Sequence, residues 1–113
     1  MSAPPFSVPY PCLVADVGGT NARFAILTGP DAALSPMLRR DTGSEADFAR
    51  TTLRAIEEGG FPRPRSLLLA VAGPPVGKRA ELSNTAVAGG RLTVDGDALA
   101  ASLGLEQGLL FND

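Results

Sequence analysis

Residues 12–27 read CLVADVGGTNARFAIL, and this stretch decides how the rest of the chain folds. The apolar run Leu13–Val17 is too short for a helix and rich in β-forming residues, and a second run, Phe24–Leu27, follows closely. Between them, Gly18-Gly19 is typical of a tight turn that needs positive φ, so the stretch predicts two strands joined by a hairpin. We expect the first strand, broken only by Asp16, to be central in a sheet and buried on both faces.

The tip of this predicted hairpin is unusually polar. Two glycines let backbone N–H groups approach a phosphate, and the side chains of Thr20 and Asn21 can add donors. Asp16 cannot contact a phosphate directly, but its carboxylate can hold a hydrated Mg²⁺ that does. The pattern is neither a Walker A loop nor a Rossmann fingerprint, since no Gly-Lys-Ser/Thr follows and a strand comes next. The alternative is an ordinary hairpin with a polar tip.

Composition places the chain among soluble globular domains. Its 113 residues are 44% hydrophobic and 19% charged, and the net charge of −2 argues against a nucleic-acid partner. A single cysteine, Cys12, and no histidine exclude an internal disulfide and make a zinc site unlikely. Residues 1–11 hold four prolines and predict a flexible N-terminal arm. No targeting or membrane-spanning segment is visible, since the longest apolar run is 67–72, and we expect a cytoplasmic location.

The remaining chain predicts further strands and two helices. A capping-box-like start at 44–47 leads into a helix whose stripe is Phe48, Thr52, Leu53, Ala55 and Ile56 and which Gly59-Gly60 ends. A second helix is capped by Asp95 and stopped by Gly104. The other predicted strands are 37–42, a doubly buried run beginning at Ser66 and ending by Gly73, 79–82, 91–94 and 108–111.

Residues 16–25, DVGGTNARFA, resemble the first phosphate motif of bacterial ATP-dependent glucokinases, in the sugar kinase, Hsp70 and actin superfamily. The resemblance continues in 70–74, in Ser83-Asn84 and in 110–113. It implies an α/β, ribonuclease-H-like (actin-like ATPase) lobe: a mixed five-stranded sheet with an antiparallel hairpin and parallel βαβ units. Ligands then gather at the carboxyl ends of the parallel strands, where the glycine turn, Gly73-Pro74 and Asn112-Asp113 are expected.

The resemblance also implies site residues. Asp16, Gly18, Gly19, Thr20, Asn21 and Arg23 correspond to the ATP-phosphate site, with Asp16 holding Mg²⁺ through water; Arg23 can instead pair with an acid. Asn84 and Asn112 correspond to sugar ligands, although Asn84 can also simply cap a turn. Asp113 corresponds to a sugar ligand and to the base that accepts the proton of the attacking hydroxyl. The family usually has an aromatic residue after Asn84, and here Thr85 follows.

Several functions stay open at this point. The first is transfer of the ATP γ-phosphate to the 6-hydroxyl of glucose, with ATP and Mg²⁺ as cofactors and glucose as substrate. The alternatives are another hexose or N-acetylhexosamine kinase, a non-catalytic one-lobe binding module, and a ROK-type repressor, which the short stretch before Cys12 disfavours. The resemblance assigns residues 12–113 to the N-terminal lobe only. We therefore expect this chain alone to be inactive and its exposed lobe face to self-associate or form a homodimer.

Overall fold

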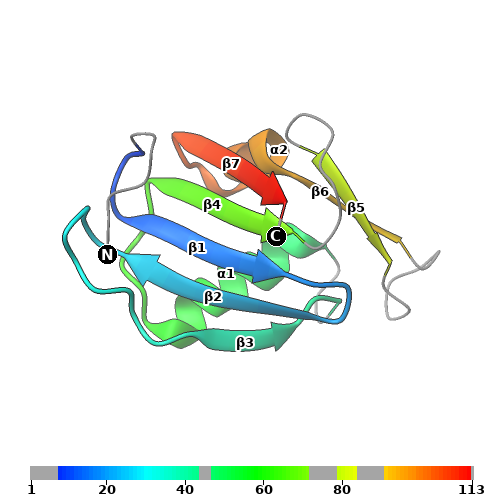
Figure 1. Cartoon of the computed structure of the whole chain (residues 1–113), viewed down its shortest axis with the longest axis horizontal. Coiled ribbons are helices and arrows are strands. Elements are labelled where there is room, and N and C mark those ends of the chain that lie inside the picture. Colours follow the sequence, from blue (N-terminus) through cyan, green and yellow to red (C-terminus); the bar gives the residue numbers. More distant parts are fainter. Residues whose placement is uncertain (1–7, 44–46, 72–78, 84–90, 113) are drawn as a thin grey trace.

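The computed structural model describes residues 8–43, 47–71, 79–83 and 91–112. Its main sheet has five strands in the order β3-β2-β1-β4-β7 (Figure 1). β2 pairs antiparallel with β1 and β3, whereas β1, β4 and β7 are parallel. The elements are β1 (Cys12–Val17), β2 (Asn21–Leu27), β3 (Leu38–Asp41), α1 (Phe48–Gly59), β4 (Ser66–Val71), β5 (Arg79–Ser83), β6 (Arg91–Asp95), α2 (Gly96–Leu103) and β7 (Gln107–Asn112). The predicted mixed α/β sheet is confirmed.

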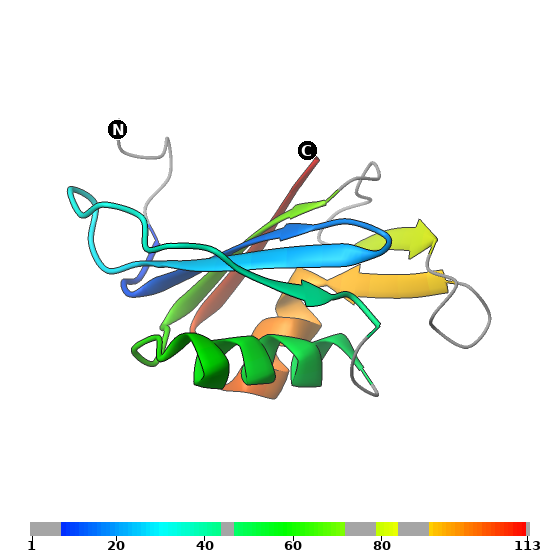
Figure 2. The same cartoon turned by 90° about the horizontal axis from the view of Figure 1, so that it is seen from below.

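Both helices cover the same face of this sheet (Figure 2). Alternate residues of β1, β2 and β4 point into the layer between sheet and helices, because side chains on a strand alternate between its faces. Phe24 of β2 is fully buried there and stacks on Phe48 of α1, with ring centroids 6.1 Å apart. The separate hairpin β5–β6 adds Ala80, Leu82, Leu92 and Val94 to this core.

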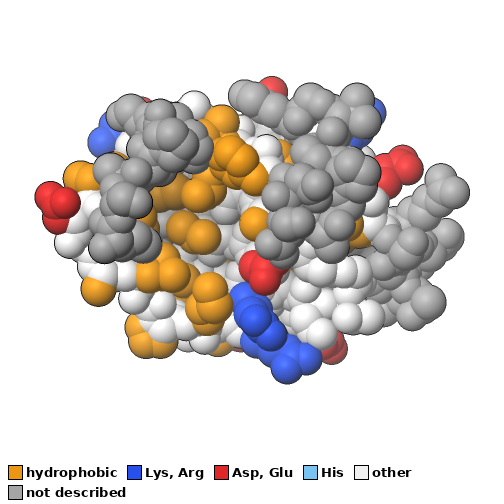
Figure 3. All heavy atoms as spheres, in the orientation of Figure 1, with side chains coloured by type: hydrophobic (Ala, Val, Ile, Leu, Met, Phe, Trp, Pro, Cys, Tyr) orange, Lys and Arg blue, Asp and Glu red, His pale blue; other side chains and the backbone are white. Residues whose placement is uncertain are grey.

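The opposite face of the sheet is largely uncovered in the part of the chain described. Val14 and Asp16 of β1 are only half-buried, as are Leu68 and Ala70 of β4. Among the described residues, β1 and β4 are buried on both faces only at their amino ends, at Cys12 and Ser66, because both helices pack on the other side of the sheet. Figure 3 shows hydrophobic side chains gathered on this open face over the strands.

Helix α1 begins at Phe48, one residue after Asp47, the last residue of the predicted start; residues 44–46 lie outside the described part of the chain. The Asp47 side chain is the N-cap and accepts a hydrogen bond from the Arg50 N–H at 2.8 Å. The helix ends as predicted, with Gly60 in the left-handed region at φ 62°. Leu53 is 47% exposed and Thr51 is buried instead, because 48, 51, 52 and 55 share a face at helical spacing and 53 does not.

Helix α2 matches its prediction. Asp95 accepts from the Ala98 N–H at 3.0 Å, and Gly104, at φ 71°, forms the C-cap. The helix packs tightly on β7, where a Cβ built on Gly108 would lie 2.2 Å from the Gly96 carbonyl oxygen. Only a residue without a side chain fits at 108.

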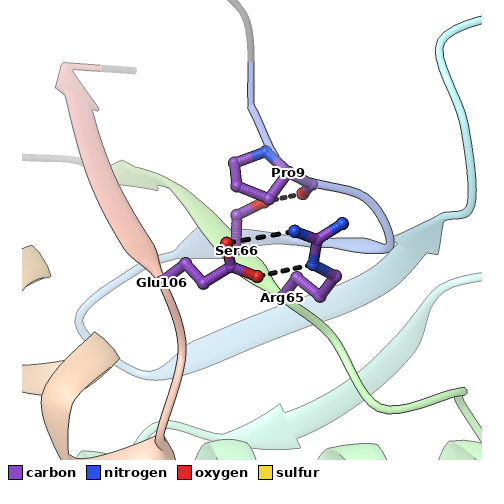
Figure 4. Close-up of polar contacts among 4 residues, drawn as sticks. All are labelled: Pro9, Arg65, Ser66 and Glu106. Carbon is purple, nitrogen blue, oxygen red and sulfur yellow. Dashed lines mark hydrogen bonds and ion pairs between the residues drawn. The ribbon is translucent and has the colours of Figure 1, made fainter.

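Residues 8–11 lie against the amino ends of β1 and β4. The Ser66 hydroxyl donates to the Pro9 carbonyl (Figure 4). Val8 is buried, and the Pro11 carbonyl accepts from the Arg65 N–H. Beside them, the Arg65 guanidinium forms a two-point ion pair with Glu106, which joins the starts of β4 and β7. The contacts at the amino ends of the parallel strands thus hold the fold together.

Candidate active site

The glycine turn joins β1 to β2 at the carboxyl end of β1. The Gly18 N–H donates to the Asn21 carbonyl at 2.8 Å, and a Cβ at Gly18 would lie 3.2 Å from that oxygen. The hairpin is confirmed, but the expectation of positive φ at Gly18-Gly19 is wrong: of the glycines described, only Gly60 and Gly104 have positive φ. Gly18 is needed here for close approach of the backbone, not for a left-handed conformation.

Thr42, just after β3, holds the turn from one side. Its N–H donates to the Thr20 carbonyl and its hydroxyl to the Gly18 carbonyl, both at 2.8 Å, and its side chain is 1% exposed. Two carbonyls of the turn are thereby occupied. Within the described residues, the N–H groups of Gly19 and Thr20 donate to no carbonyl outside the strand ladders. A turn with occupied acceptors and available donors suits an anion.

The side chains at the tip form a short chain of hydrogen bonds. Asn21 Nδ2 donates to Thr20 Oγ1 at 3.3 Å, and Arg39 Nε of β3 donates to Asn21 Oδ1 at 3.2 Å. Thr20 is exposed. Beside this chain lies a polar hollow of about 400 Å³ lined by Asn21, Arg39, Arg40 and Asp41. The sequence predicted Thr20 and Asn21 but missed Arg39 and Thr42.

A row of charges crosses the open face next to the turn. Asp16 of β1 is the Cα partner of Arg23 in β2, and Arg23 is the partner of Arg39 in β3, so the three side chains leave the same face. Figure 3 shows acidic and basic side chains side by side on this face. Asp16 is half-buried and has other interactions, whereas Arg23 is exposed. The row therefore presents a carboxylate and two guanidinium groups near the turn.

The strand register brings the end of β7 to the same edge of the sheet. Val17, Val71 and Asn112 are aligned across β1, β4 and β7. With strands spaced about 4.8 Å apart, the Asn112 backbone lies about 10 Å from the end of β1. The Asn112 side chain, Asn84, Asp113 and Gly73-Pro74 lie outside what the structure describes.

A metal ion at this edge would have few protein ligands among the described residues. No group of three or more His, Cys, Asp or Glu side chains in the described ranges could hold a metal ion. Mg²⁺ usually keeps several waters and takes one or two carboxylates plus substrate phosphates. Asp16, a carboxylate beside a donor-rich turn, fits that kind of site.

Other features serve packing. A hollow of about 510 Å³ lies where α1 and α2 end and is lined mainly by apolar residues, with Glu57 and Arg63 among them. Cys12 is buried, and burial raises the pKa of its thiol, which disfavours a reactive thiolate. No helix among the described residues is both long and apolar enough to span a membrane.

A mixed sheet of this order, with a glycine turn after its first strand, defines a ribonuclease-H-like lobe of the actin-like ATPase kind. This is the class that the sequence predicted. The family model described as "Glucokinase" matches residues 13–113, and the chain belongs to the glucokinase family.

Relatives and a solved structure agree with this assignment. The chain is 39% identical to a glucokinase of Sinorhizobium medicae over 95% of its own length and 30% of that protein. It is 42% identical to one of Sinorhizobium fredii over 99% of its length and 32% of that protein. The chain is similar in structure to a glucokinase from an Antarctic psychrotroph, with a TM-score of 0.71 and 23% identity. The match covers 90% of this chain and 32% of the psychrotroph enzyme. The chain thus spans about a third of the length of these glucokinases.

Proposed function

We propose that this chain is the N-terminal lobe, residues 12–113, of an ATP-dependent glucokinase that transfers the γ-phosphate to the 6-hydroxyl of glucose. One observation carries the proposal: the donor-rich turn after β1 lies at the same sheet edge as the end of β7. Family membership supports glucose as the substrate. Since the reaction consumes ATP, we propose a cytoplasmic location.

In this proposal the turn binds the ATP phosphates. Gly18 shapes the turn, because its N–H donates to the Asn21 carbonyl. The Gly19 N–H and the side chains of Thr20 and Asn21 donate to the phosphates at the tip. Arg23 adds positive charge from the neighbouring strand. Asp16 holds Mg²⁺ through water, and the metal neutralises charge on the phosphates when bound.

The end of β7 supplies the acceptor side of the reaction. Asn112 and Asn84 hydrogen-bond sugar hydroxyls, and Asp113 binds the sugar and accepts the proton of its 6-hydroxyl. The new O–P bond forms at the γ-phosphorus as the bond to the β-phosphate oxygen breaks, and ADP leaves. A carboxylate suits this role because phosphoryl transfer needs an oriented nucleophile with a proton acceptor beside it.

The single lobe is not expected to turn over. Orientation of reactants in a closed cleft supplies roughly 7–11 kcal/mol, which is about five to eight powers of ten in rate. We therefore expect residues 1–113 alone to show no glucose-dependent ADP release. Measurable turnover by the isolated lobe would contradict the requirement for a second lobe.

The function is tested in a polypeptide that joins this chain to a second lobe. Initial rates with MgATP are measured for glucose, mannose, N-acetylglucosamine and N-acetylmannosamine. Glucose should give the highest kcat/KM, and Asp16→Asn should weaken the Mg²⁺ dependence of the rate. Preference for an N-acetylhexosamine would reassign the substrate, and absence of turnover with all four sugars would favour a binding module.

A further inference from the structure

The hydrogen bonds at the tip of the turn have a fixed direction. Arginine has N–H donors and no acceptor, so the Asn21 atom that faces Arg39 Nε at 3.2 Å must be the amide oxygen. The amide nitrogen then faces Thr20, where it donates to Oγ1 at 3.3 Å. Because the Thr20 oxygen accepts this bond, its own proton is available to donate elsewhere.

We propose that Arg39 is a positioning residue that fixes the Asn21 amide and so makes the exposed tip of the turn a hydrogen-bond donor for phosphate. This inference rests on the proposed function, because it names how the phosphate turn is oriented. Without Arg39, the Asn21 amide is free to turn over and present its oxygen to the ligand. An amide oxygen at the tip would repel an anion instead of binding it.

The charges around Arg39 also favour a bound anion. Arg39 and Arg23 are directly opposed on neighbouring strands, and like charges in that position are destabilising. Asp16 on the far side of Arg23 supplies one negative charge, which leaves the row of three net positive. A bound phosphate would offset the repulsion between these two guanidinium groups.

Asp41 limits where the anion can lie. It is the Cα partner of Asn21 and lines the same polar hollow of about 400 Å³ as Arg39 and Arg40. Its carboxylate disfavours an anion inside that hollow. The phosphate is therefore expected on the side of Gly19 and Thr20, where N–H and hydroxyl donors are available, with Arg39 acting through Asn21.

The role of Arg39 is tested by NMR on the ¹⁵N-labelled 113-residue chain, with tripolyphosphate as the probe. Two signals are followed: the backbone amides of Gly19 and Thr20, and the side-chain amide of Asn21. The variants are Arg39→Gln, which removes the fixed donor, and Arg39→Lys, which keeps the charge. Arg63→Gln is the matched control, since it removes the same charge from an exposed position near the amino end of β4.

We expect Arg39→Gln to weaken tripolyphosphate binding about tenfold, the effect of losing one hydrogen bond to a charged group. Even without ligand, it should lower the heteronuclear NOE of the Asn21 side-chain amide. Arg39→Lys should recover part of both effects, and Arg63→Gln should behave as the parent chain. Loss of affinity with an unchanged Asn21 NOE would overturn positioning and leave only a charge effect.

The two proposals fail in different ways. If the parent chain binds tripolyphosphate at the turn and Arg39→Gln binds equally well, the role of Arg39 is refuted and the phosphate turn stands. If tripolyphosphate leaves the Gly19 and Thr20 signals of the parent chain unchanged, the phosphate turn itself is refuted. In that case the Asn21 NOE without ligand still decides whether Arg39 orders the amide.

Discussion

The Thr42 hydroxyl donates to the Gly18 carbonyl oxygen at 2.8 Å and so ties the end of β3 to the turn after β1. The two residues are 24 positions apart in the chain, and the Thr42 side chain is 1% exposed. Since the Thr42 N–H also donates to Thr20, one residue fixes two carbonyls of the turn. The geometry of the proposed phosphate site thus depends on a residue whose own N–H and hydroxyl donate within the protein.

Replacing Thr42 by valine should test this link. Thr42→Val keeps the shape of the side chain but leaves the Gly18 carbonyl without the hydroxyl, which should lower the free energy of unfolding by about 1–3 kcal/mol. Urea denaturation measures the change. Thr93→Val, at an exposed position in β6, is the matched control and should be nearly neutral. Equal stability of both variants would show that the Thr42 hydroxyl does not hold the turn.

Gly108 should tolerate no side chain. A Cβ there would lie 2.2 Å from the Gly96 carbonyl oxygen, which is backbone and cannot rotate away. Gly108→Ala should lower the free energy of unfolding by about 3 kcal/mol through displacement of α2 from β7. Gly29→Ala is the control, because nothing lies within 4 Å of its Cβ position. Thermal or urea unfolding should separate the two, and a Gly108→Ala chain as stable as Gly29→Ala would refute the close packing.

The cap of α2 should make stability depend on pH. The hydrogen bond from the Ala98 N–H, with the nearby Arg79 guanidinium, lowers the pKa of Asp95 below its ordinary value of 3.8. A carboxyl whose pKa is lowered on folding stabilises the fold above its unfolded pKa, and this stabilisation is lost as the pH falls through the folded pKa. Asn caps a helix as well as Asp but does not titrate. The stability advantage of the parent chain over Asp95→Asn should therefore be present at pH 7 and shrink below about pH 4.

Urea midpoints of the two chains at pH 7 and pH 3 measure this effect. The difference between the chains, not either midpoint alone, isolates the Asp95 carboxylate. A difference that is constant across this range would mean that the Asp95 charge contributes nothing to the fold.

The open face of the sheet should make the isolated lobe self-associate. Val14, Leu68 and Leu109, all half-buried, form an apolar row across β1, β4 and β7 on this face. Exposed apolar faces of this kind are characteristic of interfaces. Sedimentation velocity at high micromolar concentration should show association that Leu109→Lys suppresses. Leu53→Lys adds the same charge on α1, at a leucine already 47% exposed, and should leave association unchanged. A strictly monomeric parent chain would contradict the expectation.

Features set by local chemistry could be predicted from the sequence. The caps at Asp95, Gly60 and Gly104 depend on residues a few positions away, and all three are as predicted. The positions of the strands along the chain follow from apolar runs separated by clear turn signals. The family motif also located the glycine turn and the end of β7 at one edge.

Features that depend on pairing between distant segments could not be predicted from the sequence. Thr42 and Arg39 reach the turn only because β3 pairs with β2 in a particular register, and no local pattern reveals that register. An apolar run such as 66–71 shows that a strand is buried on at least one face but not which face a helix covers. The apolar stripe of α1 was misjudged at Leu53 because threonine, not leucine, occupies the core-facing position at 51.

The catalytic assignment of Asp113 is the central claim, and one comparison tests it most directly. Glucose phosphorylation is measured with Asp113 and with Asp113→Asn in a polypeptide that joins this chain to a second lobe. Loss of a general base should lower kcat by roughly 10²–10⁴ while the KM for glucose changes little. An Asp113→Asn enzyme that keeps the parent rate would contradict the account.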